Sequence, residues 1–403
     1  MKYLIILGDG MADEPVESLG GKTPLQYAQT PSMDYLAEKG CSGLLNAIPR
    51  GMAPGSEVAN LSVLGYNVAE VLEGRGSLEA ASMGVDILPG EMAMRCNLIC
   101  IENGKIKNHS AGHISNEEAG ILIAYLNDRL ANDRLRFFQG VSYRHLLKLK
   151  DGDKRLICTP PHDVCGTEFS RVLIRPAHPD AQPAAGYLND LILRSQELLA
   201  DHPVNLKRKA AGKDAANSIW PWSPGYKPAM EKFSTLYPVR SGAVISAVDL
   251  IKGIGVYAGL EIIEVAGATG LYDTNYEGKA RAALMALKEK DFVYLHVEAS
   301  DEAGHEGNVD LKVKTIEYLD SRILKIILDE TKHWTEPLTI AVLPDHPTPC
   351  RIKTHTGDPV PFVICNPTLT PDTVTVYDEF SAKKGKWGLL NGDEFIRAFF
   401  NKL

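Results

Sequence analysis

The sequence predicts an α/β protein with a mostly parallel sheet, helices on both faces of that sheet, and a smaller inserted α+β domain. Two observations support this class: buried-strand patterns alternate with helical patterns near both ends of the chain, and the middle third lacks that regularity. A chain of 403 residues also exceeds the size of one ordinary hydrophobic core. We therefore expect a main domain of residues 1–91 and 236–403, and an inserted domain of residues 92–235.

The N-terminal segment predicts one strand followed by two helices. Residues 3–7 are apolar and stop at a Gly-Asp pair, so they fit a first strand and are too short for a signal peptide. Residues 32–39 show helical spacing and end at a glycine. A loop rich in glycine and proline, residues 49–55, leads into residues 56–66, whose apolar side chains again recur at helical spacing.

The predicted inserted domain mixes short strands with helices, and it is dense in turn signals such as Glu102-Asn103-Gly104. The expected strands cover residues 96–101, 156–158 and 172–174, and the expected helices cover residues 117–130 and 186–200. Residues 220–226 are rich in aromatic side chains and proline. They mark the end of this domain and are candidates to line a cleft or a hinge.

Regular alternation of helices and strands returns after the inserted domain. The expected helices cover residues 245–252, 276–288 and 309–330, and the strands that follow them cover residues 260–265, 292–297 and 338–343. This order is typical of right-handed crossovers in a parallel sheet. A further apolar run at 360–364 and a C-terminal amphipathic helix at 392–402 complete the expected elements.

The composition excludes several classes of partner. The net charge is −8 and the chain has no long basic run, which argues against binding of nucleic acid. No segment approaches the ~18 uninterrupted apolar residues that a membrane span requires. The seven cysteines include no CxxC pair, so we expect reduced thiols and a cytoplasmic protein.

Carboxylate and imidazole side chains follow three of the predicted strands. These candidate ligands are Asp9 after the first strand, Asp301 and His305 after the strand at 292–297, and Asp345 and His346 after the strand at 338–343, with His355 nine residues further on. Each alone has a structural interpretation, as a turn residue or as a surface pair on a helix. Because the carboxyl ends of parallel strands meet at one edge of a sheet, we expect the whole set to converge there.

This set of candidate ligands contains carboxylates and imidazoles but no thiol, which suits Mn²⁺ or Zn²⁺ and, less well, Mg²⁺. With Ser56 the candidates number seven, enough for two adjacent cations of the kind that assist displacement at phosphorus. Ser56 begins a predicted helix directly after Pro54-Gly55. A serine in that place is commonly an N-cap, but beside a metal ion it would be a nucleophile whose phosphorylated form the helix N-terminus stabilises.

The candidate residues lie in motifs that together resemble the alkaline phosphatase superfamily, and within it the archaeal type of cofactor-independent phosphoglycerate mutase. The motifs are Asp9, Pro54-Gly55-Ser56-Glu57-Val58-Ala59-Asn60-Leu61, Asp301-xxx-His305, Asp345-His346 and His355, with Gly21-Lys22-Thr23-Pro24-Leu25, Gly74-Arg75-Gly76 and Asp273-Thr274-Asn275-Tyr276-Glu277-Gly278-Lys279. The resemblance covers nearly the whole chain. It implies the alkaline-phosphatase-like form of the α/β fold predicted above.

This resemblance implies a role for every candidate ligand. Asp9, Ser56, Asp345 and His346 would hold one metal ion, and Asp301, His305 and His355 would hold the other. Ser56 would take the phosphoryl group from 3-phosphoglycerate and return it to the other hydroxyl to give 2-phosphoglycerate, without 2,3-bisphosphoglycerate or an organic cofactor. The implied partner is a small phosphorylated metabolite, and neither a nucleic acid nor a membrane is involved.

The resemblance also implies that the inserted domain binds the glycerate and closes over the site, which would exclude water and disfavour simple phosphatase activity. The candidate substrate-binding residues are His113, Arg144, His162 and Asp163 in that domain and Lys279 in the main domain. Each also has a plain structural interpretation. Arg144 fits a solvated strand residue, and Lys279 fits a charge on a helix surface.

One stretch departs from the pattern of the archaeal mutases. Residues 108–114, Asn-His-Ser-Ala-Gly-His-Ile, carry two histidines where those mutases carry arginines, and histidine lacks the planar fork with which arginine grips carboxylates and phosphates. A sister group with this histidine pattern is proposed to act as homoserine kinase. The alternative is therefore a homoserine kinase-type phosphotransferase of threonine biosynthesis, with ATP as donor, on the same two-metal core.

Two further interpretations of the sequence are weaker. The chain has no GxxxxGK[ST] motif, so any use of ATP would not be of the P-loop type, and residues 253–259 lack the GxGxxG spacing of a dinucleotide loop. A metal-stabilised binding protein is the non-enzyme alternative. It gives no reason for a serine to stand in a glycine-rich turn at a helix N-terminus.

Overall fold

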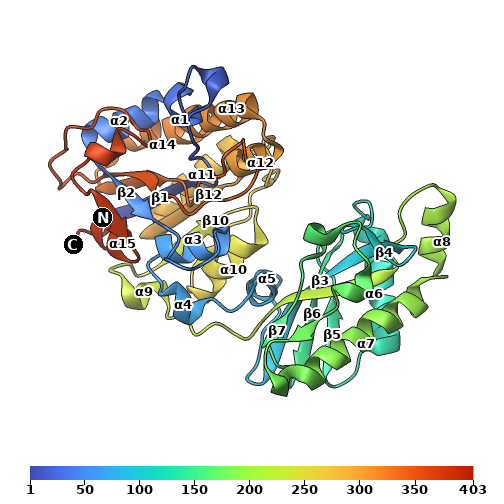
Figure 1. The fold of residues 1–403 in the computed structure, drawn as a ribbon. Helices are drawn as coiled ribbons and strands as arrows, with labels where there is room; N and C mark the ends of the chain where they lie inside the picture. The colour runs from blue at the N-terminus through green and yellow to red at the C-terminus, as the bar shows by residue number, and fades with distance from the viewer. Residues whose placement is uncertain (403) are drawn as a thin grey trace. The chain divides into compact units, whose positions relative to one another are not determined.

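A computed structural model describes residues 1–402 and divides the chain into two compact units (Figure 1). The first unit consists of Met1–Leu72 and Ala229–Leu403, and the second consists of Glu73–Pro228. None of the described helices is long and apolar enough to cross a membrane. All seven cysteines are free thiols, as the sequence predicted.

The first unit is built on an eight-stranded sheet with the order β11-β10-β12-β1-β13-β14-β2-β15. The strands are β1 (Lys2–Gly8), β2 (Cys41–Asn46), β10 (Gly242–Ile245), β11 (Glu261–Ile262), β12 (Phe292–Val297), β13 (Leu338–Leu343), β14 (Val360–Cys365) and β15 (Leu389–Asn391). Strand β14 pairs antiparallel with both of its neighbours, and the other pairings are parallel. The predicted α/β class with a mostly parallel sheet is therefore confirmed.

Helices cover both faces of this sheet, which explains its uninterrupted apolar strands (Figure 1). They are α1 (Pro24–Tyr27), α2 (Pro31–Lys39), α3 (Ser56–Val63), α4 (Val68–Val71), α9 (Phe233–Leu236), α10 (Asp249–Tyr257), α11 (Tyr276–Glu289), α12 (Ala299–Glu306), α13 (Val309–Leu319), α14 (Lys325–Thr331) and α15 (Glu394–Phe399). Helices α2, α11, α13 and α14 pack their apolar side chains on one face, and α3 and α10 lie on the other. Four successive residues of β1, Leu4 to Leu7, are completely buried between these layers.

Several predicted elements of the first unit are corrected by the structure. Residues 245–252 do not form one helix, because residues 242–245 are strand β10 and helix α10 starts at Asp249. The apolar run in β10 is so short that its periodicity does not distinguish a strand from a helix. The predicted strand at 260–265 is reduced to β11, and the helix at 392–402 is reduced to α15. Strands β2 and β15 lie outside the predicted elements.

The second unit contains a five-stranded antiparallel sheet in which β3 is central. The order is β4-β3-β6-β5, and β9 also pairs with β3. The strands are β3 (Glu91–Glu102), β4 (Lys105–Asn108), β5 (Leu135–Phe138), β6 (Arg144–Lys150) and β9 (Ser218–Gly225), with a separate pair of β7 (Leu156–Ile157) and β8 (Arg175–Pro176). Helices α5 (Arg75–Ser82), α6 (Asn116–Leu130), α7 (Gln182–Leu199) and α8 (Pro203–Ala210) complete this α+β unit.

The boundaries of the second unit differ from the predicted 92–235. Helix α5 belongs to this unit because it packs directly on β3: a Cβ added at Gly76 would lie 2.6 Å from the Cα atom of Met94. Residues 220–226 are not a hinge loop, since most of them lie in strand β9 and pair with β3. Residues 172–174 form no strand; the two-residue strand β8 follows them.

Candidate active site

Three parallel strands end at one edge of the first unit's sheet, and the candidate ligands follow them there. The register places Gly8 of β1 beside Val297 of β12, and Leu7 beside Leu343 of β13, so the three strands end at the same level. Asp9 directly follows β1, and Asp345 follows β13 after a single proline. Helix α12 starts two residues after β12 ends and carries Asp301 in its first turn. The predicted convergence of these carboxylates is therefore present in the structure.

The first group of side chains surrounds the hydroxyl of Ser56. The Ser56 Oγ atom lies 3.5 Å from Asp9 Oδ2 and 3.3 Å from His346 Nε2. The same His346 nitrogen lies 3.6 Å from Asp9 Oδ1 and 3.5 Å from Asp345 Oδ2. Asp9, Asp345 and His346 are almost completely buried, whereas Ser56 at the start of α3 is half-buried. The hydroxyl is thus the accessible member of a buried polar group.

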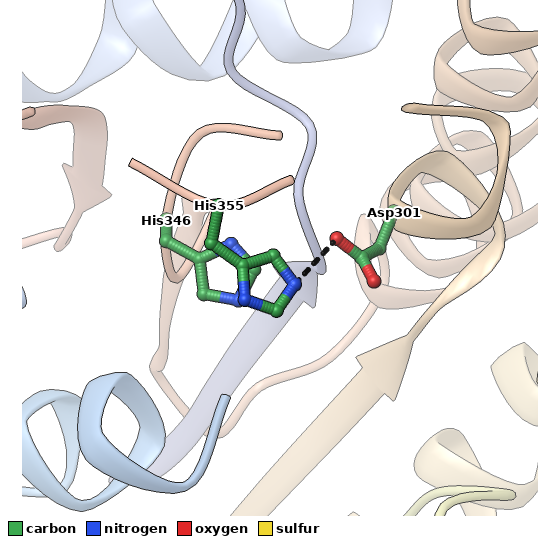
Figure 2. Close-up of side chains that lie close together, drawn as sticks. All are labelled: Asp301, His346 and His355. Carbon is green, nitrogen blue, oxygen red and sulfur yellow. Dashed lines mark ion pairs between the residues drawn. The ribbon is translucent and has the colours of Figure 1, made fainter. Parts of the chain in front are cut away.

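The second group consists of Asp301, His305 and His355. The Nε2 atom of His305 lies 3.2 Å from Asp301 Oδ2, and that of His355 lies 3.5 Å from Asp301 Oδ1. The two Nε2 atoms are 3.0 Å apart. Figure 2 shows the rings of His346 and His355 side by side, facing Asp301 on the opposite element, and their centroids are 4.0 Å apart. The two groups are therefore one continuous cluster.

The buried carboxylates of this cluster favour the binding of a cation. The Oδ1 atom of Asp9 is buried without a hydrogen-bond partner. Burial, followed by repulsion from Asp345, Asp301 and Glu298, raises the pKa of Asp9 well above its usual value. Asp301 shows the opposite behaviour: burial opposes its ionisation, but hydrogen bonds from His305 and His355 hold its pKa well below the usual range. An uncompensated buried carboxylate is costly unless a positive charge pairs with it.

The donor atoms fit divalent metal ions. One set of ligand atoms from Asp9, Asp345 and His346 lies within 4.8 Å of one another, and so does a set from Asp301, His346 and His355. Carboxylate oxygens and imidazole nitrogens without a thiol suit Mn²⁺ and Zn²⁺. The unpartnered Asp9 oxygen and this donor set together support the residues predicted as ligands.

Some residues of the cluster were missed by reasoning from sequence. His296 is completely buried in β12, with its Nε2 atom 3.1 Å from Asp9 Oδ2 and its Nδ1 atom 3.3 Å from Ser246 Oγ. Burial lowers the pKa of His296 to about 3, so the ring is neutral. A lone histidine inside an otherwise apolar strand was the available signal. A neutral imidazole there orients the Asp9 carboxylate.

Asn60 is a second missed residue and links the helix that carries Ser56 to the loop that carries Asp345. Its amide donates to Ser56 O at 2.8 Å and to Asp345 Oδ2 at 2.9 Å. The hydroxyl of Tyr294 donates to Asn60 Oδ1 at 2.6 Å. These bonds fix α3, and therefore Ser56, relative to Asp345. Sequence spacing carries no sign of the bonds to Asp345 and Tyr294, because these partners are more than 200 residues from Asn60 in the chain.

Comparisons with known proteins agree with this geometry. Residues 37–205 match the family model described as 2,3-bisphosphoglycerate-independent phosphoglycerate mutase. The protein of that name from Methanosarcina barkeri is 54% identical over 98% of this chain and 98% of its own length. The chain belongs to this family. A probable 2,3-bisphosphoglycerate-independent phosphoglycerate mutase from Geobacter sulfurreducens is 46% identical over 98% of each chain.

Solved structures extend the similarity to the fold of this mutase-family chain. The PH0037 protein from Pyrococcus horikoshii superposes with a TM-score of 0.84 at 32% identity, covering 100% of this chain and 98% of that one. The cofactor-independent phosphoglycerate mutase from Thermoplasma acidophilum superposes with a TM-score of 0.67 at 26% identity, covering 100% and 99%. The fold and the family resemblance predicted from sequence are confirmed.

In the second unit, the predicted substrate-binding residues of this family member gather on one face. The ring of His113 lies 6.0 Å from that of Tyr143, and the Arg144 guanidinium lies over the same ring at 6.0 Å. The ring of His109, a residue outside the predicted substrate-binding set, lies 5.8 Å from that of Tyr143 and 6.1 Å from that of His162. This group of His109, His113, Tyr143, Arg144 and His162 is called the histidine face below.

The remaining two candidates differ in their surroundings. Asp163 is exposed and adjoins the histidine face through His162, whose Nε2 atom is 3.5 Å from Asp163 Oδ1. Lys279 in the first unit is not a surface charge: it is completely buried in α11 and donates to the carbonyl of His296 at 3.0 Å. Burial lowers the pKa of Lys279 to about 8. The ammonium is thus held near the strand that carries His296.

Proposed function

We propose that this chain interconverts 3-phosphoglycerate and 2-phosphoglycerate through a phosphoserine at Ser56, without 2,3-bisphosphoglycerate. The observation that carries the proposal is the position of the Ser56 hydroxyl, 3.3 Å from His346 and 3.5 Å from Asp9 in a cluster rich in buried carboxylates. A hydroxyl in that setting is suited to nucleophilic attack on phosphorus. The names of the relatives supply the substrate.

Two divalent cations fit the cluster, with Mn²⁺ or Zn²⁺ preferred over Mg²⁺. Asp9, Ser56, Asp345 and His346 would hold one, and Asp301, His305 and His355 would hold the other. When bound, these ions supply positive charge that favours the deprotonated serine and neutralises phosphoryl oxygens. The buried Asp9 carboxylate, whose Oδ1 atom has no hydrogen-bond partner, then gains a compensating positive charge.

The chemistry of the chain's own residues balances over two transfers. Ser56 Oγ attacks the phosphorus of 3-phosphoglycerate and the 3-hydroxyl oxygen leaves, taking up a proton. The 2-hydroxyl of the same glycerate then attacks the phosphoserine, loses its proton, and returns Ser56 to its free form. Ser56 is the first residue of α3, and the N-terminus of a helix favours a bound phosphate. No atom is gained or lost overall, as an isomerase requires.

The histidine face is proposed to bind the substrate. Imidazole N–H groups and the Arg144 guanidinium are donors suited to the carboxylate and hydroxyls of glycerate. The exposed ring of His113 and the exposed Arg144 are accessible to a ligand in the structure. Lys279 of the first unit is completely buried and donates to the carbonyl of His296, so its candidacy as a substrate contact rests on the family resemblance.

The homoserine kinase alternative rests on the two histidines at 109 and 113 and has no support from the relatives reported above. Two assays separate it from the mutase. Protein loaded with Mn²⁺ and given 3-phosphoglycerate without ATP is expected to form 2-phosphoglycerate. Formation of phosphohomoserine and ADP from ATP and homoserine, with no turnover of 3-phosphoglycerate, would favour the kinase instead.

The decisive variant is Ser56→Ala, which is expected to abolish mutase turnover while leaving the fold intact. Ser62→Ala is the matched control, because Ser62 lies in the same helix and its buried hydroxyl has no hydrogen-bond partner. Incubation with ³²P-labelled 3-phosphoglycerate is expected to label the wild type and Ser62→Ala, but not Ser56→Ala. Equal turnover by wild type and Ser56→Ala would overturn the proposal.

A further inference from the structure

Thr348 connects the two groups of proposed ligands. It lies in the loop between β13 and β14 and is completely buried. Its Oγ1 atom is 2.5 Å from Asp301 Oδ1 and 3.3 Å from His346 Nδ1. Asp301 belongs to one proposed metal site and His346 to the other. One hydroxyl therefore contacts a ligand of each site.

The direction of these hydrogen bonds follows from the donors and acceptors available. An ionised Asp301 only accepts, so the single hydroxyl hydrogen of Thr348 is donated to it. The Thr348 oxygen is then the acceptor for the Nδ1–H group of His346. This arrangement leaves the lone pair of His346 on Nε2, the nitrogen that lies 3.3 Å from Ser56 Oγ and 3.6 Å from Asp9 Oδ1. The tautomer needed for a metal ligand is the one that Thr348 selects.

The backbone holds Thr348 firmly in this position. It stands between Pro347 and Pro349, which restrict its own backbone and that of its neighbour. Its N–H group donates to Ala12 O at 3.2 Å, and the completely buried Lys312 ammonium donates to its carbonyl at 2.8 Å. The flanking prolines and the hydrogen bonds of the Thr348 N–H and carbonyl groups therefore fix the backbone that carries the hydroxyl.

Two glycines, Gly10 and Gly304, permit their own backbone segments to approach Thr348 closely. A Cβ added at Gly10 would lie 2.6 Å from Thr348 Oγ1, and one added at Gly304 would lie 2.4 Å from the Thr348 carbonyl oxygen. Gly304 is in α12, the helix that carries Asp301. Any larger residue at either glycine would push Thr348 away from the helix. The local backbone is thus shaped around this threonine.

We propose that Thr348 is a positioning residue that couples the two metal sites, by fixing the tautomer of His346 and the orientation of Asp301 through one hydroxyl. This inference rests on the proposed two-metal function. It concerns how well the protein binds the ions, so metal binding tests it without an activity assay. Removal of a residue that orients metal ligands costs ~10–100-fold in metal affinity.

The test is titration of EDTA-treated, dialysed protein with Mn²⁺, following free Mn²⁺ by electron paramagnetic resonance. Thr348→Val keeps the shape and removes the hydroxyl, and it is expected to weaken both binding steps ~10–100-fold. Thr348→Ser restores the hydroxyl and is expected to recover most of the affinity. Thr356→Val is the matched control, because Thr356 lies in the same loop and its hydroxyl has no partner.

The outcomes separate this inference from the function on which it rests. A wild type that binds fewer than two Mn²⁺ ions per chain would overturn the two-metal proposal. If the wild type binds two ions and Thr348→Val binds them with unchanged midpoints, only the role of Thr348 fails. Weakening of only one of the two Mn²⁺-binding steps would also overturn the proposal that Thr348 couples the two sites. Thermal unfolding of the metal-free variants checks that each is folded before titration.

Discussion

The two polar clusters of this protein are built in different ways. The first unit's cluster, which is proposed to bind metal ions, consists of side chains that follow parallel strands, and most of its members are buried and lie within hydrogen-bond distance of one another. The histidine face of the second unit lies on loops and on the start of β6, and its members are exposed or half-buried. Chemistry at phosphorus requires preorganised charge, which burial supplies. Recognition of a small ligand requires accessible donors.

The largest effect is expected from Asp345→Asn. This carboxylate is completely buried and accepts hydrogen bonds from Gly10 N, His346 N and Asn60 Nδ2. An amide of the same shape removes the charge, and we expect kcat/KM to fall by at least ~10³-fold with loss of one bound metal ion. Turnover and metal content per chain measure this.

The control for that variant is Asp358→Asn, an exposed carboxylate in the loop before β14. It is expected to keep wild-type turnover and metal content. Full activity in Asp345→Asn would contradict the claim that the buried cluster supplies the charge for catalysis. The proposed difference in role between this cluster and the histidine face would then fail.

A smaller effect, on KM instead of metal content, is expected from a substitution in the histidine face. His113→Phe keeps a ring beside Tyr143 and removes the imidazole N–H donors. Because a hydrogen bond to a charged ligand contributes ~1.5–3 kcal/mol, we expect KM for 3-phosphoglycerate to rise ~10–100-fold with metal content unchanged. Steady-state kinetics and metal analysis on the same sample measure the two quantities.

His202→Phe is the matched control in the same unit, since His202 caps α8 and its ring packs against Tyr125 rather than against the histidine face. It is expected to leave KM unchanged. If His113→Phe lowers the metal content instead of raising KM, the proposal that one cluster binds metal ions and the other binds substrate would be wrong.

The smallest effect concerns Lys279, a buried cation beside the metal-binding cluster. Burial lowers its pKa from 10.5 to about 8, so the folded protein binds this proton more weakly than the unfolded chain does. The resulting destabilisation is fully present below pH ~8 and disappears as the pH rises towards ~10.5. Lys279→Met is therefore expected to raise the free energy of unfolding by about 1–3 kcal/mol at pH 7, and by less at pH 10.

Urea unfolding of the metal-free protein at both pH values measures that change. Lys288→Met, at an exposed position of the same helix, serves as the control and is expected to change stability little. A loss of stability in Lys279→Met at pH 7 would show that the hydrogen bond to the His296 carbonyl outweighs the cost of burying the charge.

The sequence by itself determined the α/β class, the three strands that end beside the candidate ligands, and the candidate ligands themselves. These features follow from hydrophobic periodicity and from covalent adjacency: Asp9 and Asp345 stand next to strands of unmistakable pattern. The short strand β10 was not predicted, and its last residue, Ile245, was placed in the helix expected at 245–252, because so short an apolar run has too little periodicity to decide.

Only the tertiary structure decided how the ligands are oriented. His296, Asn60 and Thr348 contact Asp9, Asp345 and Asp301 respectively, and in each case the partners are tens or hundreds of residues apart. The boundary at Glu73 likewise depends on α5 packing against β3. Such contacts depend on strand register and side-chain packing, which bring together residues whose relation leaves no periodic trace along the chain.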